Sequence, residues 1–260
     1  MNRTGLVIAL AVGAVVGVVF GVYPQLDIAI SRPFYDPARN VFPIIYSLVA
    51  RHLRDIFNYT TAILVAPAII AIVLKFILPR RRMLIPGRAA IFLVATIALA
   101  PGVMANVILK ENWNRPRPVE VTELGGDLKF VPWWDPRGTC EKNCSFVAGE
   151  GSGGFWTFAP AALAPPAWRP LAFAAAFLFG AAAGGLRLFA GAHFFSDVAF
   201  SGVFTFLIVW LVYALIYRWP ATRITDEQVE RAIEKMVLPV QDRVLRLISR
   251  RGGSKAGEQP

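Results

Sequence analysis

Two residues in the C-terminal half of the chain have the spacing of a nucleophilic pair. His193 and Asp197 are four residues apart, so on a helix they lie on one face within contact distance. A carboxylate bound to one imidazole nitrogen fixes the tautomer and leaves the other nitrogen free to attack an electrophile. The spacing therefore predicts that His193 is a nucleophile and that Asp197 orients it.

Three cations stand close to the ends of apolar segments: Lys110, Arg117 and Arg187. Taken singly, each is explained as a side chain that extends from a helix end into water. Gathered beside a histidine, they would neutralise the equatorial oxygens of a phosphoryl group. Gly149 precedes another apolar segment, where the N–H groups of a helix start also favour an anion. The set indicates phosphoryl chemistry, with these four residues binding phosphate.

The elements that must position these residues are long apolar segments. The chain has 260 residues, of which 56% are hydrophobic, and its mean hydropathy is +0.52. Several runs reach or approach the roughly 20 residues that cross a bilayer. We therefore expect an all-α, polytopic membrane protein with about six transmembrane helices in residues 1–220, and with its motifs in residues 110–197. Residues 221–260 are expected to form a cytoplasmic amphipathic helix and a disordered tail. The six expected spans lie at about 5–22, 56–78, 89–109, 152–164, 171–186 and 198–217.

Charge predicts the orientation of these spans. The net charge of +10 is better explained by topology and lipid contact than by nucleic acid, because cations collect at the cytoplasmic ends of spans. The loop at 79–88 and the C-terminal segment are rich in Lys and Arg, which places both in the cytoplasm. With six spans, the ends of spans three and five and the starts of spans four and six then share the outer face. The first outer loop is also basic, with Arg32, Arg39, Arg51 and Arg54.

The two cysteines, Cys140 and Cys144, lie in the long loop after the third span. On the outer face a disulfide can form between them. Two thiols without a nearby histidine make a poor zinc site, so a small stapled loop is the favoured interpretation and a metal site is the alternative.

At these residues the chain resembles the type 2 phosphatidic acid phosphatase family of membrane lipid phosphatases. The first motif of that family, Lys, six residues and Arg-Pro, fits Lys110 and Arg117-Pro118. Its third motif, Ser-Arg, five residues, His, three residues and Asp, fits Arg187, His193 and Asp197, with Leu186 in place of the serine. Its second motif, Pro-Ser-Gly-His, is reduced here to the glycine of Val147-Ala148-Gly149-Glu150.

The resemblance implies a phosphohistidine mechanism without a metal or cofactor. His193 would attack phosphorus, Asp197 would steady the imidazolium, and an acid would protonate the leaving oxygen. Glu150 occupies the position of the family's acidic histidine. Its carboxyl can serve if burial raises its pKa, although the neighbouring cations lower it. The other histidine, His52, water, or a loss of the activity are the alternatives.

An outward-facing site at the bilayer surface suits a lipid head group. The run from Cys140 to Ser152 and the segment Phe34-Tyr-Asp-Pro are similar to bacterial lipid A phosphatases, which implies lipid A as substrate and the bacterial inner membrane, with a periplasmic site, as location. Undecaprenyl pyrophosphate and phosphatidylglycerol phosphate are alternative substrates. A flippase or a non-catalytic lipid-phosphate-binding protein is the alternative of another class. The lipid substrate and the bilayer are the partners expected, and the sequence indicates no protein partner.

Overall fold

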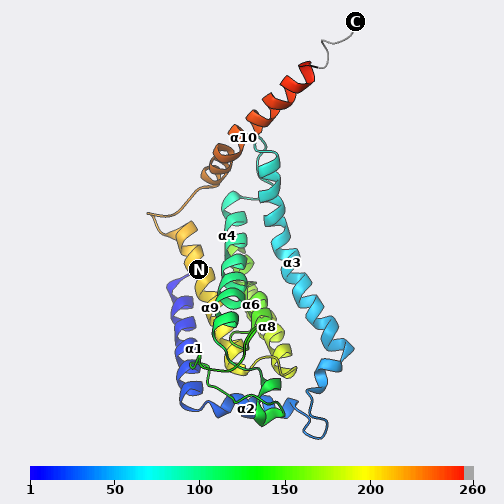
Figure 1. The fold of residues 1–260 in the computed structure, drawn as a ribbon. Coiled ribbons are helices and arrows are strands. Elements are labelled where there is room, and N and C mark those ends of the chain that lie inside the picture. Colours follow the sequence, from blue (N-terminus) through cyan, green and yellow to red (C-terminus); the bar gives the residue numbers. More distant parts are fainter. Residues whose placement is uncertain (255–260) are drawn as a thin grey trace.

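The computed structural model describes the backbone of residues 1–254 and the side chains of residues 1–243. All the regular secondary structure in the described residues is helical (Figure 1). Five helical segments are long and apolar enough to cross a membrane, which confirms the all-α, polytopic fold. They are Arg3–Val22 (α1), Leu48–Ile77 (α3), Gly87–Asn112 (α4 Gly87–Ile97, the π-helical η3 Ala98–Leu109 and α5 Lys110–Asn112), Arg169–Phe189 (α8) and Phe195–Arg218 (α9 Phe195–Tyr213 and the π-helical η6 Ala214–Arg218).

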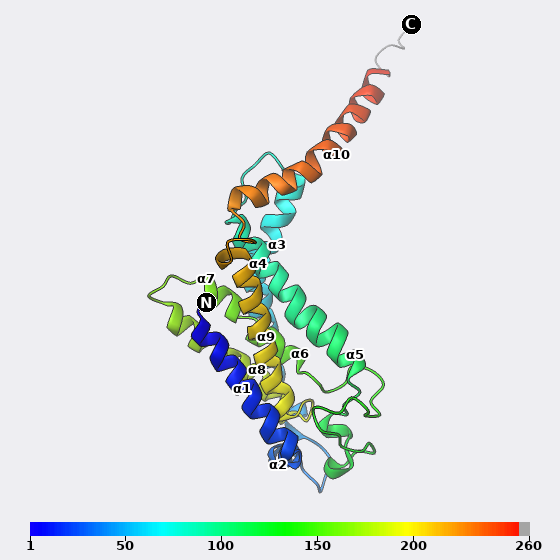
Figure 2. The same ribbon diagram turned by 90° about the vertical axis from the view of Figure 1, so that its left-hand side faces the viewer.

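Shorter elements connect these five. The remaining helices are α2 Gln25–Ser31, α6 Gly149–Phe155, α7 Phe158–Leu163 and α10 Asp226–Ser254, with single turns of 3₁₀ helix at Arg32–Phe34, Pro43–Tyr46, Pro118–Glu120 and Thr122–Leu124. Figures 1 and 2 show α1 lying along α9, α2 at one end of the bundle and α10 projecting from the opposite end.

The segment expected as a fourth span is two short helices instead of one. The chain turns between α6 and α7, where the hydroxyl of Thr157 donates to the carbonyl of Gly154 at 2.7 Å. Four of the seven residues of α6 are glycines, which favour a continuous helix poorly, and a threonine hydroxyl that takes up a backbone carbonyl competes with helical bonds. Five helices therefore have the length of a span in the described residues, where six were expected.

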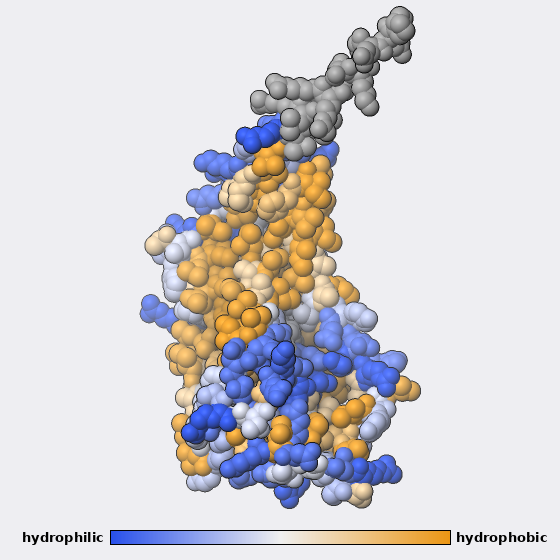
Figure 3. Space-filling view, in the orientation of Figure 1, coloured by the Kyte–Doolittle hydropathy of each residue, from blue (hydrophilic) through white to orange (hydrophobic). Residues whose placement is uncertain are grey.

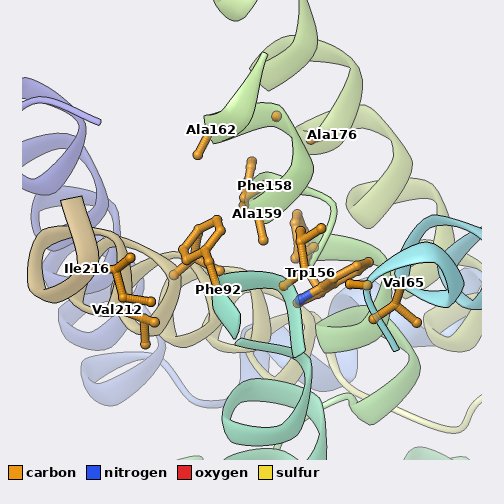
Figure 4. Packing of buried hydrophobic residues seen from close by; sticks show 14 of the residues in the cluster. Val65, Phe92, Trp156, Phe158, Ala159, Ala162, Ala176, Val212 and Ile216 are labelled. Atoms are coloured by element: carbon orange, nitrogen blue, oxygen red, sulfur yellow. The ribbon is translucent and has the colours of Figure 1, made fainter. Parts of the chain in front are cut away.

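Small residues allow α6 to pack closely against α8 and α9. A side chain at Gly180 of α8 would lie 2.2 Å from the ring of Phe155, and one at Gly184 would lie 2.3 Å from Val198. Small residues four apart let helix backbones approach in membrane proteins. Figure 4 shows the apolar cluster beside this contact, where Trp156 and Phe158 lie near Phe92. The bundle thus holds α6 fixed at its centre.

Apolar side chains cover the middle of the bundle on the face drawn in Figure 3, and hydrophilic side chains gather below them, toward the end that carries α2. The opposite end carries α10, where Lys75 of α3, buried, binds Glu230 and Glu234 at 3.0 and 2.6 Å. Val229 and Ile233 of α10 are buried while Met236 and Val240 are exposed, so only part of the expected apolar face of this helix packs on the bundle. The expected disordered tail falls largely on residues 255–260, outside the described part of the chain, and α10 itself extends to Ser254.

Candidate active site

The segments that carry the predicted site residues lie together at the end of the bundle near α2, as the parity of the spans predicts. Backbone hydrogen bonds join them. Cys144 N–H donates to the carbonyl of Lys110 at 3.1 Å, Val119 N–H donates to Gly191, and Ala148 N–H donates to Asp197. The loop after α5 is thereby tied to the starts of α6 and α9 and to the end of α8.

The three predicted phosphate-binding cations surround one region. Arg117 donates from Nε and Nη2 to the carbonyl of Asn143 at 3.0 and 2.6 Å, and Lys110 Nζ donates to the side chain of the same Asn143 at 3.2 Å. Arg187 is less satisfied. Its Nε is one of two buried side-chain nitrogen or oxygen atoms without a hydrogen-bond partner in the described part of the chain. Buried donors are nearly always paired. This N–H is therefore free to donate a hydrogen bond to an anionic oxygen.

Gly149 lies directly against Lys110. A side chain at this position would stand 3.2 Å from Lys110 Nζ and 2.6 Å from the side-chain oxygen of Asn106. The absence of a Cβ therefore lets the first turn of α6 approach the lysine, which gives a physical reason for a glycine here.

His193 is buried at the edge of this group, with 2% of its surface exposed. Its Nδ1 lies 2.6 Å from the carbonyl oxygen of Ser145. A carbonyl only accepts, so Nδ1 carries the proton and Nε2 is the nitrogen with a free lone pair. Burial, together with the charges of Lys110, Arg117 and Arg187, holds the pKa of the His193 imidazole well below its ordinary value, and the ring is neutral at physiological pH.

Asp197 does not contact His193 in the way that the spacing predicts. The hydrogen bonds of its carboxylate go to Ser145 Oγ at 2.5 Å, to Phe194 N–H at 2.8 Å and to Arg115. Asp197 is the third residue of α9, so its carboxylate turns back to cap the helix start. Ser145 stands between the two predicted partners, and the direct pair of the sequence hypothesis is corrected to a His193–Ser145–Asp197 chain.

The structure adds two fully buried residues that the motif analysis missed. Arg115 lies inside the first motif, between its lysine and its arginine, and Asp27 lies on α2. Their side chains meet at 2.7 Å. The only sequence signal for Asp27 is a carboxylate between the apolar residues Leu26 and Ile28, which is too weak to single it out.

Glu150 is held by arginines. Arg54 of α3 binds it through Nε and Nη2, with distances from 2.7 to 3.0 Å, and Arg187 Nε lies 3.5 Å from the same carboxylate. Burial alone raises the pKa of the Glu150 carboxyl, but the bonds from Arg54 and the charges of Arg187 and Lys110 outweigh it, and the pKa lies below its ordinary value. In this arrangement Glu150 is an anion without a proton to donate. Arg54, which the sequence indicates only as one of several cations in the first outer loop, thus contacts a predicted site residue.

Two further expectations concern His52 and the cysteines. His52 is exposed on α3 and lines a shallow apolar groove with Leu48 and Ile56. Cys140 and Cys144 form a disulfide, which closes the loop that carries Asn143. No group of three or more His, Cys, Asp or Glu side chains that could hold a metal ion occurs in the residues that the structure describes.

Comparison with known proteins gives a consistent result. A lipid A 4'-phosphatase of Francisella tularensis subsp. novicida is 34% identical over 220 residues, which cover 84% of this chain and 98% of that protein. Lipid A 4'-phosphatases of Rhizobium leguminosarum and Rhizobium etli are 36% and 37% identical over 105 residues, or 40% of this chain and 45% and 41% of theirs. No solved structure matches the chain.

The family model described as PAP2 superfamily matches residues 89–221. This range begins within α4, ends three residues after η6 and contains all three motif segments. By this match and by the relative that aligns over almost its whole length, the chain belongs to the PAP2 superfamily.

Proposed function

We propose that this membrane phosphatase removes the 4'-phosphate from lipid A through a phosphohistidine intermediate on His193. The substrate is supported by the Francisella relative, which bears the name lipid A 4'-phosphatase and aligns over 98% of its length. The observation that carries the proposed chemistry is a neutral, buried His193 whose Nδ1 is bound to Ser145 while Lys110, Arg117 and Arg187 act on it electrostatically.

In the first step the lone pair of His193 Nε2 attacks phosphorus and the bond from phosphorus to the sugar oxygen breaks. Lys110, Arg117 and Arg187 neutralise the charge on the three non-bridging oxygens, which is the main task of a phosphoryl-transfer enzyme. The Nε of Arg187, which lacks a hydrogen-bond partner, is a natural donor to one of these oxygens. The Gly149 N–H and Arg54 complete the phosphate site.

The leaving sugar oxygen takes a proton as the bond breaks, and Glu150 is the proposed donor. In the structure the carboxylate of Glu150 accepts hydrogen bonds from Arg54 and forms an ion pair with Arg187. An incoming phosphate competes with Glu150 for both arginines, and it takes over the hydrogen bonds of Arg54 and the ion pair of Arg187. Glu150 then loses the contacts that lower its pKa and keeps the burial that raises it. Substrate binding would thus convert an ionised carboxylate into an acid.

In the second step water attacks the phosphohistidine, Glu150 accepts its proton, and phosphate leaves while His193 recovers its lone pair. The ring carries a positive charge as long as the phosphorus–nitrogen bond exists. Asp197 lies beyond Ser145 on the Nδ1 side of the ring, where a negative charge stabilises the imidazolium.

The proposed location is the bacterial inner membrane, with the site on the periplasmic face. The disulfide lies at the site end of the bundle and suits an oxidising compartment. The cation-rich loop at 79–88 and α10, which bind each other through Arg88 and Asp226, lie at the opposite end and suit the cytoplasmic surface. On this basis residues 221–260 form a cytoplasmic appendage to the membrane domain of residues 1–220.

The test uses the full chain purified in detergent. Lipid A, undecaprenyl pyrophosphate and phosphatidylglycerol phosphate are each incubated with wild-type protein and with His193→Ala, and phosphate release is measured. Release from lipid A by wild type alone, with mass spectra that show loss of the 4'-phosphate, is the expected result. Equal release by the His193→Ala variant, or none from lipid A, would overturn the proposal.

A further inference from the structure

A buried ionic network is connected to the Nδ1 side of the His193 ring. At its centre is Arg115, whose side chain is fully buried. Its Nη2 donates to Asp27 at 2.7 Å, its Nη1 donates to Ser196 at 2.9 Å and also to Asp197, and its Nε donates to the carbonyl of Val131 at 3.1 Å. Each of the three nitrogens of the planar fork thereby donates to a fixed acceptor.

Asp27 joins this network from α2, a helix that precedes the whole motif region. One carboxylate oxygen accepts from Ser196 N–H at 3.0 Å, and the other accepts from the hydroxyl of the same serine at 2.6 Å. Ser196 is in the first turn of α9. Asp27 therefore both caps the helix that carries Asp197 and fixes one arm of Arg115.

The network reaches the nucleophile through two further contacts. Arg115 holds one oxygen of Asp197, while the other oxygen accepts from Ser145 Oγ at 2.5 Å. The carbonyl of Ser145 then accepts from His193 Nδ1 at 2.6 Å. An unbroken sequence of hydrogen bonds runs from Asp27 to the imidazole, and each member is at least 98% buried.

We propose that Arg115 and Asp27 are positioning residues for the proposed phosphoryl transfer, which act through Asp197 and Ser145 to fix the orientation of the His193 ring. The inference rests on the proposed function of His193 as nucleophile. It adds to the catalytic apparatus a residue of α2, 166 positions before the histidine in the sequence.

The charge of the network supports a role beyond packing. Buried ion pairs contribute little net stability, because desolvation offsets their attraction. With both carboxylates ionised, two acids and one guanidinium carry a formal charge of −1 beside a histidine that becomes positive when it binds phosphorus. The net negative charge of the network that fixes the ring therefore stabilises the positive charge that the ring acquires, and this benefit arises only as the reaction proceeds.

The experiment compares Asp27→Asn with wild type, both as full chains in detergent, on the lipid phosphate that wild type hydrolyses. Asn keeps the shape of the side chain and removes its charge. We expect kcat to fall by about 10- to 100-fold, because a displaced reacting group costs rates of that order. KM and the inhibition constant for inorganic phosphate should stay within about twofold, since the phosphate-binding cations are unchanged. Asp27→Glu should restore part of kcat.

Two variants separate positioning from folding. Ser31→Ala removes a buried hydroxyl of α2 that bonds only to the backbone of Asp27. This control variant should keep the wild-type kcat. Ser196→Ala removes the hydroxyl shared by Arg115 and Asp27 and leaves every charge in place. It should lower kcat by about 3- to 10-fold. This variant tests the proposal even where Asp27→Asn does not fold.

The inference is overturned if folded Asp27→Asn and Ser196→Ala keep the wild-type kcat, or if Ser31→Ala loses as much activity as they do. An equal loss of kcat and of phosphate affinity also overturns it, because that pattern means collapse of the whole site. Failure of the proposed function has a different signature: wild type itself releases no phosphate, or His193→Ala releases as much.

Discussion

The proposed competition between the Glu150 carboxylate and a bound phosphate for Arg54 and Arg187 can be tested by the substitution Glu150→Gln. Glutamine keeps the length of the side chain and can still accept from Arg54, but it carries no charge and cannot donate a proton as an acid does. The proposed mechanism gives Glu150 two tasks of opposite effect. It competes with phosphate for arginines in the free protein, and it protonates the leaving oxygen in the complex.

The size of the first effect follows from the contacts. Arg54 binds Glu150 through two nitrogens, but its side chain is 47% exposed, whereas Arg187 is 19% exposed and lies 3.5 Å away. A half-exposed ion pair contributes about 0–1 kcal/mol, and a better shielded one contributes about 1 kcal/mol more. Loss of the competing charge should therefore tighten phosphate binding by about 1.4 kcal/mol, or about tenfold.

The second effect is larger and lowers the rate. A positioned general acid contributes roughly 10²- to 10⁴-fold, so kcat of Glu150→Gln should fall by at least about 100-fold. The assay measures release of radiolabelled phosphate from lipid A, with inorganic phosphate as a competitive product inhibitor. Glu111→Gln is the matched control, because Glu111 is exposed on α5 and its loss removes the same charge near the site.

Three results of this assay contradict the reasoning in different ways. If kcat of Glu150→Gln stays within about twofold of wild type, Glu150 is not the acid. If the inhibition constant for phosphate is unchanged, its carboxylate does not compete for the phosphate site. If Glu111→Gln tightens phosphate binding equally, the effect is one of general charge.

Three further predictions concern the nucleophile, α10 and the disulfide. Because the pKa of His193 lies below its ordinary value of 6.5, the neutral ring persists on acidification, and kcat/KM should begin to fall only below that pH; a fall centred at or above it would contradict the burial argument. Lys75→Met should weaken the docking of α10 by about 2–3 kcal/mol, since two glutamates lose a buried partner. Limited proteolysis should then cut the linker at residues 219–225 faster than it cuts the same linker in the control variant Lys235→Met. Replacing Cys140 and Cys144 by serine should raise KM several-fold, because the disulfide contributes about 2 kcal/mol to the ordering of this short loop. A reductant should raise the KM of wild type in the same way and leave that of the variant unchanged.

Much of the architecture follows from local sequence. A run of about 20 apolar residues must become a helix in lipid, because no other structure satisfies its backbone. The order of such runs fixes which ends meet, and this parity brought Lys110, Arg117, Arg187 and His193 to one end of the bundle. The fourth segment was harder to interpret. Its glycines and the Thr157 turn divide it into α6 and α7, and helices packed inside a bundle need not have the length of a span.

The motif spacings also predicted the cations and the proposed nucleophile, since residues that act together on one phosphate keep a fixed spacing along the chain. The partners of these residues come from elsewhere in the chain. Ser145 enters between His193 and Asp197 because a helix cap draws the carboxylate back toward the start of α9. Arg54 and Asp27 reach the candidate site from α3 and α2, and their local sequence is too weak a signal to single them out.

The sequence by itself therefore predicted which side chains carry the proposed chemistry, and it determined at which end of the bundle they lie. The tertiary structure decided the charge state and orientation of those side chains. A pKa or a hydrogen bond depends on every group within a few ångströms, whatever its place in the chain. Two long-range contacts, Arg54 with Glu150 and Asp27 with Arg115, hold Glu150 as a bound anion and connect the surroundings of His193 to α2.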